Sequence, residues 1–142
     1  MSLFDMVPTR QEQILENFEK FHGDNPQVYR LFKRFALLAI QSGRSRYSSD
    51  MISHRIRWHV EIETTGEPVK MNDHYTAYYA RLFEADHPEH QGFFRKRKLK
   101  SAEREGYEVN LTVVHGESPD DAVERQLGER LRRLLDNGGG AQ

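Results

Sequence analysis

Apolar side chains recur every three or four positions through most of residues 9–85, and this spacing constrains the fold more than any other feature of the sequence. The spacing places those side chains along one face of an α-helix. It predicts helices at about 9–21, 26–41, 48–63 and 72–85. The sequence therefore predicts a mainly α-helical fold with a four-helix core. The residues predicted to be buried in that core are Phe32, Phe35, Ile52, Ile56, Tyr79 and Leu82.

Capping residues mark the predicted helix boundaries. Thr9 with Glu12 forms a capping box, and Asn25 precedes a proline in the first helical position. Ser48 or Ser49 is expected to cap the third helix, and Asn72 or Asp73 the fourth. Leu38 is placed on the buried stripe of the second helix, with Arg30, Lys33 and Arg34 off it.

The chain changes character after Pro88. A basic run from Arg95 to Lys100 is followed by alternating apolar and polar residues from Val109 to Val113, which is typical of a strand and would allow a short β-hairpin or wing. Ser118 and Pro119 then begin an amphipathic C-terminal helix that ends near Gly138. We expect an N-terminal arm at 1–8, a helical domain at 9–100 and an appendage at 101–142 with one strand, one helix and a disordered end.

Composition excludes several classes of protein. The 142 residues include no Cys, which removes disulfide frameworks, thiolate zinc sites and Cys nucleophiles. The sequence contains neither a signal-peptide pattern nor an apolar run long enough to span a membrane, so we expect a cytoplasmic protein without membrane contact. The net charge of −1 means that any nucleic-acid contact must come from a local basic patch.

The second and third predicted helices, joined by a short turn with Gly43, resemble a helix-turn-helix, a motif whose second helix enters the DNA major groove. This interpretation predicts DNA contacts from the turn and from the outer face of the third helix. The predicted contacts are Arg44, Arg46, Ser53, His54 and Arg57. The alternative is that two amphipathic helices with a glycine turn merely share this appearance and that the outer face is solvated.

The basic run is predicted to contact phosphates, because each such contact releases counterions from DNA. The predicted phosphate contacts are Arg95, Lys96, Arg97, Lys98 and Lys100. The run could equally be a solvated surface, and the adjacent Phe93 and Phe94 could stack on bases, although two adjacent Phe more often anchor a core.

No cofactor or catalytic residue is predicted, and we expect the protein not to be an enzyme. Asp86, His87 and His90 have a spacing that could hold a divalent ion, but a further ligand is not evident. Glu67 and Lys70 fit poorly to the carboxylates and lysine of a metal-dependent nuclease. That class is the weakest of the three functional hypotheses.

The stretch from Phe21 to Lys98 resembles a family of small phage- and prophage-associated proteins. The matching segments are NPQVYRLF at Asn25–Phe32, IRW at Ile56–Trp58, KMND at Lys70–Asp73, YAR at Tyr79–Arg81 and GFFRKR at Gly92–Arg97. The resemblance implies a phage-borne accessory protein, either a DNA-binding regulator or DNA-metabolism factor, or a protein that inhibits a host protein. In the second case Trp58 and Arg81 are the expected partner contacts. The leucines of the C-terminal helix would dock on the domain or form a homodimer.

Overall fold

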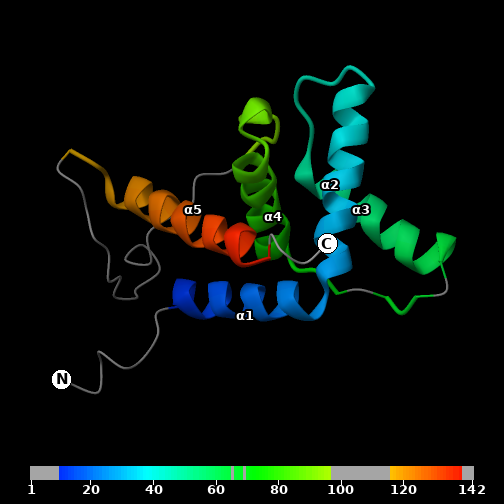
Figure 1. The fold of residues 1–142 in the computed structure, drawn as a ribbon, viewed down its shortest axis with the longest axis horizontal. Coiled ribbons are helices and arrows are strands. Elements are labelled where there is room, and N and C mark those ends of the chain that lie inside the picture. The colour runs from blue at the N-terminus through cyan, green and yellow to red at the C-terminus, as the bar shows by residue number, and fades with distance from the viewer. Residues whose placement is uncertain (1–9, 65, 69, 97–115, 139–142) are drawn as a thin grey trace.

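The computed structural model describes residues 10–64, 66–68, 70–96 and 116–138, and its helices are labelled in Figure 1. In chain order the helical elements are α1 (Arg10–Asp24), α2 (Pro26–Gln41), α3 (Ser49–Trp58), the π-helical turn η2 (His59–Glu63), α4 (Asp73–Asp86), the 3₁₀ turn η3 (Pro88–His90) and α5 (Pro119–Gly138). The predicted mainly helical fold is confirmed, including the helix near the C-terminus.

Side-chain caps begin two of the helices where the sequence predicts them. The hydroxyl of Ser48 accepts the N–H of Met51 at 3.4 Å at the start of α3. The side-chain oxygen of Asn72 accepts the N–H of Tyr75 at 3.0 Å at the start of α4. Each bond satisfies one of the N–H groups that a helix start leaves without a partner.

Asn25 was expected to cap α2, but its side chain does not accept a hydrogen bond from the helix. The residue nevertheless holds the capping position. Its amide instead donates to the carbonyl of Phe21 at 3.0 Å. Asn25 therefore closes the end of α1, while Pro26 at the first helical position starts α2.

The helices pack around α4. Figure 1 shows α2 and α4 standing side by side, with α1 lying across their lower ends. The helix α5 packs against α4, and α3 runs from its contact with α2 and α4 toward the edge of the molecule. No described helix is both long enough and apolar enough to cross a membrane.

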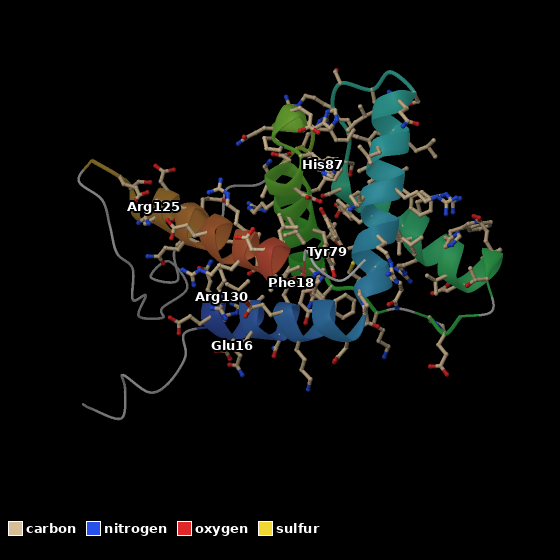
Figure 2. The ribbon with its side chains drawn as sticks, viewed as in Figure 1. Glu16, Phe18, Tyr79, His87, Arg125 and Arg130 are labelled. Carbon is tan, nitrogen blue, oxygen red and sulfur yellow. The ribbon has the colours of Figure 1, made fainter. Side chains whose placement is uncertain are left out.

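Aromatic side chains fill the space between α1, α2 and α4. Tyr79 is fully buried, and its ring lies 4.9 Å from Phe18 and 5.8 Å from Phe32 between centroids. Figure 2 shows Phe18 and Tyr79 converging where α1 meets α4. Rings at such separations add to the free energy of burial, so this cluster fixes how the three helices meet. The six residues predicted to be buried in the core all are.

The helix α5 contributes to the same core. Leu127 and Leu131 are buried and belong to the cluster formed by the other helices. Arg130 of α5 pairs with Glu19 of α1, and Figure 2 shows Arg130 directed toward α1. The predicted leucine stripe therefore packs on the domain.

Extended backbone is scarce in the described residues. Their β-type pairing consists of one isolated parallel bridge between Tyr47 and Phe94. The predicted strand at Val109–Val113 and the remainder of the basic run, from Arg97 to Lys100, lie outside the described residues.

Candidate nucleic-acid interface

The bridge between Tyr47 and Phe94 joins the α2–α3 turn to the beginning of the basic run. The N–H of Tyr47 donates to the carbonyl of Phe93 at 3.0 Å, and the N–H of Arg95 donates to the carbonyl of Tyr47 at 3.4 Å. The backbone of Arg95 thus lies beside that of the turn. The sequence-based hypothesis is that the turn and the run form one DNA-facing surface, and the described parts of the two segments are in backbone contact.

Buried rings hold this junction in place. Phe94 is 2% exposed, and its ring lies 5.3 Å from Phe32 of α2 and 5.6 Å from Phe83 of α4 between centroids. Phe93 is also buried. The two phenylalanines anchor this segment in the core, so they are not available to stack on nucleic-acid bases. Arg95, the residue that follows them, is exposed.

Three arginines are exposed around this junction, and we call them the turn surface: Arg44, Arg46 and Arg95. None of them forms an ion pair or hydrogen bond through its side chain with another residue that the structure describes. Gly43, with φ of 101°, ends α2 and redirects the chain so that Arg44 and Arg46 leave the helix axis. The guanidinium groups are therefore available to an external anion.

Three of the predicted DNA contacts lie on α3, and two of them are exposed. His54 and Arg57 are exposed, as predicted, while Ile52 and Ile56 face the core. Ser53 was predicted to face DNA, but it is buried. The buried face of α3 is wide enough to include Ser53 as well as Ile52. Ser53 therefore cannot reach a ligand at the surface.

Lys96 was predicted to contact phosphate, and the structure gives it an internal partner. Its ammonium donates to the carboxylate of Glu84, a buried residue of α4. The same carboxylate accepts the N–H of Gly92 at 3.0 Å and the N–H of Phe94 at 3.1 Å. Sequence analysis missed Glu84. A lone glutamate among aromatics in an amphipathic helix was the available signal.

Arg81 was predicted to contact a partner protein, and the structure gives it an internal partner. Its guanidinium binds Glu124 of α5 through two bonds, Nε to Oε2 at 2.8 Å and Nη2 to Oε1 at 2.7 Å. Its side chain is only 9% exposed. A forked pair of this kind is strong and directional, so Arg81 joins α4 to α5.

Large exposed apolar side chains gather on α3 and η2. Met51, Trp58 and Ile62 are exposed, and their spacing of seven and four residues places them on one helix face. We call them the apolar stripe. Leu38 of α2 is exposed as well, which corrects its predicted burial, because α2 packs on the side of Phe32, Phe35 and Ala36 and leaves Leu38 at the margin.

The residues considered for a metal have other contacts. Asp86 accepts the hydroxyl of Tyr29 at 2.7 Å, and His87 stacks on Phe83 with 4.5 Å between ring centroids. Figure 2 shows His87 at the upper end of α4. Within the described ranges, no group of three or more His, Asp or Glu side chains is arranged to hold a metal ion.

Burial also shifts the pKa values of polar groups in the core. It raises the pKa of Tyr78 to about 12, and it raises the pKa of Tyr79 as well. Burial lowers the pKa of His22 below 6.5, and its Nδ1 lies 3.1 Å from the Tyr79 hydroxyl. Tyr78 and Tyr79 are therefore neutral core residues rather than nucleophiles.

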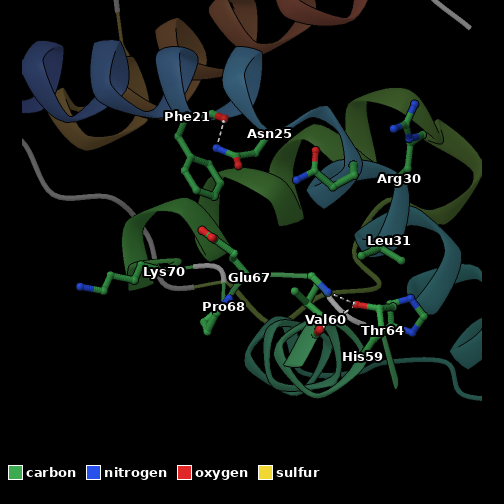
Figure 3. A pocket seen from close by; sticks show the side chains of 12 residues that line it. Phe21, Asn25, Arg30, Leu31, His59, Val60, Thr64, Glu67, Pro68 and Lys70 are labelled. Atoms are coloured by element: carbon green, nitrogen blue, oxygen red, sulfur yellow. Dashed lines mark hydrogen bonds between the residues drawn. The ribbon is translucent and has the colours of Figure 1, made fainter. Parts of the chain in front are cut away.

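A separate pocket of about 740 Å³ opens between the α1–α2 corner and the segment that follows η2 (Figure 3). Phe21, Leu31 and Val60 form its apolar part, and Arg30 and Lys70 lie at its rim. Among its described lining residues Glu67 is the one carboxylate, whereas metal-dependent nucleases use two or three. The pocket contains no residue of the turn surface.

Comparison with known proteins adds no relative. No family model matches the chain, and no significant match was found among curated proteins or solved structures.

Proposed function

We propose that this protein binds duplex DNA through the turn surface, with His54 and Arg57 of α3 as neighbouring contacts. The observation that supports this function is the Tyr47–Phe94 bridge, which places Arg95 beside the turn that carries Arg44 and Arg46. Three exposed guanidinium groups on one short stretch of surface fit a row of phosphates, because each offers five donors in a rigid fork.

The charge distribution supports a local interface rather than general affinity for polyanions. The chain as a whole carries a net charge of −1. Binding must then depend on the few cations that have no internal partner. Asp50 of α3 and Glu61 of η2 are exposed, as are His54 and Arg57 of α3, so contacts to base edges would be limited to His54 and Arg57.

The resemblance to phage and prophage proteins indicates where such binding would be used. A small DNA-binding accessory protein of this type would act in regulation or in DNA metabolism. That role corresponds to a cytoplasmic location, as the absence of Cys also suggests.

Binding to a duplex of random sequence across a salt series tests this proposal. Wild-type protein should bind at low salt, and the triple variant Arg44→Ala, Arg46→Ala and Arg95→Ala should lower the salt slope by about one unit per lost contact. The matched control replaces Lys20, Arg132 and Arg133, which are exposed on α1 and α5, and removes the same charge. Equal losses in both triples would show a nonspecific charge effect and overturn the assignment.

The apolar stripe supports a second candidate, a protein that binds and inhibits a host protein. Exposed apolar residues grouped on one helix face are typical of protein interfaces, where Trp often dominates the binding energy. Trp58 is 57% exposed and is the single Trp of the sequence. Its fluorescence therefore distinguishes the two functions. A blue shift on adding a candidate host protein, without a shift on adding DNA, would favour the second.

A further inference from the structure

We propose that Glu84 is a positioning residue for the turn surface. Its carboxylate fixes the segment from Gly92 to Lys96 against α4 and thereby sets where Arg95 lies relative to Arg46. This inference rests on the proposed DNA contact, and it adds a residue that touches no DNA. We call the carboxylate of Glu84, the N–H groups of Gly92 and Phe94 and the ammonium of Lys96 the Glu84 clamp.

The burial of Glu84 is the first observation. The residue is 5% exposed. A carboxylate seldom lies so deep unless several donors replace the water that it loses. Here two backbone N–H groups, at 3.0 and 3.1 Å, and one ammonium provide that replacement. All three donors come from one segment of five residues, so the carboxylate determines the path of that segment.

The path of this segment matters because the turn is bonded to it. Phe93 and Arg95 exchange backbone hydrogen bonds with Tyr47, on either side of the Phe94 N–H that Glu84 holds. Gly92 has φ of 86°, which lets the chain reverse after η3 and present its N–H to the carboxylate. Glu84 is thus linked through the segment to the residue that follows Arg46.

The clamp also distinguishes the two basic residues of the segment. Both are exposed, but the ammonium of Lys96 pairs with Glu84, whereas the side chain of Arg95 has no partner among the described residues. In the described part of the run, Arg95 is therefore the expected phosphate contact.

The substitution Glu84→Gln separates a positioning role from a simple charge effect, because the two predict opposite changes in DNA affinity. If Glu84 acts only through its charge, removing that negative charge should tighten DNA binding. If Glu84 positions the segment, binding of the random duplex should weaken and the salt slope should fall by about one unit, since Arg95 is no longer held. The control Glu89→Gln makes the same charge change at an exposed side chain of η3 and should tighten binding slightly.

Amide exchange provides a second test that does not depend on DNA. Exchange should accelerate at Gly92, Phe94 and Tyr47 in Glu84→Gln while α1 and α4 keep their protection. If Glu84→Gln does not fold, Glu84→Asp keeps the charge, shortens the reach and should show the same pattern. Unaltered exchange in the Glu84 variants, or tighter DNA binding by Glu84→Gln, would overturn the proposal. If wild-type protein fails to bind DNA, the proposed function fails, and the exchange result still decides whether Glu84 positions the segment.

Discussion

The arginines on two sides of this molecule have opposite roles. On the side of α1, α4 and α5, Arg81 pairs with Glu124, Arg130 with Glu19, and Arg125 with Glu117 and Glu129. Figure 2 shows Arg125 and Arg130 along α5. At the α2–α3 turn, Arg44, Arg46 and Arg95 extend into solvent and have no side-chain partner among the described residues.

The difference shows that residue type alone does not identify a binding surface. Arginine joins helices where an acidic residue of another helix lies within reach, and it is available to a ligand where none does. We therefore expect the paired side to contribute to stability, and we propose that the turn side contributes to function. Substitutions on the two sides should separate these properties.

The largest effect is expected at Arg81. Arg81→Ala removes a nearly buried guanidinium that binds Glu124 through two hydrogen bonds, so the free energy of unfolding should fall by about 2 to 3 kcal/mol. Arg46→Ala, in an exposed residue of the turn, should change stability by less than about 0.5 kcal/mol. Urea unfolding measures both. Similar losses for the two variants would remove the distinction between the sides.

A smaller loss is expected at Arg130. Its side chain is 31% exposed, and that of Glu19 is 26% exposed. Because water screens this pair in part, Arg130→Ala should cost about 0.5 to 1 kcal/mol. A double-mutant cycle with Glu19→Ala isolates the interaction. A coupling energy near zero would mean that the Arg130–Glu19 pair does not help to hold α5 on α1.

The pH dependence should be the mildest effect, and it comes from the paired side. Burial lowers the folded-state pKa of His22 below 6.5, so the unfolded chain binds a proton more readily. The contribution of His22 to stability is then complete above pH 6.5 and is lost as the pH falls through its folded-state pKa. In His22→Gln, the urea concentration at the midpoint of unfolding should change less with pH across this range than in the wild type. If it falls as steeply as in the wild type, other groups cause the loss of stability.

Sequence periodicity predicts much of the fold because helix formation is local. Ser48 and Asn72 were recognised as caps, and Ile52 and Ile56 as buried, because each prediction needs only residues a few positions away. The helix beginning at Pro119 follows from the same reasoning.

The site was harder to predict because it depends on contacts between distant residues. Arg81 looked available in the sequence, and only the fold reveals Glu124 beside it, 43 positions away. Ser53 looked exposed because helix geometry does not tell how wide a face the neighbouring helices cover. Glu84 was overlooked because two of its three donors are backbone N–H groups, and its place among aromatic side chains does not reveal those contacts. The pairing of the turn with Arg95 is likewise a tertiary contact.

The most direct test of DNA binding at the turn surface is titration of the ¹⁵N-labelled protein with a random-sequence duplex at low salt, followed by amide chemical shifts. The amides of Tyr47 and Arg95 and those of α3 around His54 and Arg57 should move, while those of α1 and α5 should stay in place. Shifts centred on α1 and α5, or no shift anywhere at low salt, would contradict DNA binding through the turn surface.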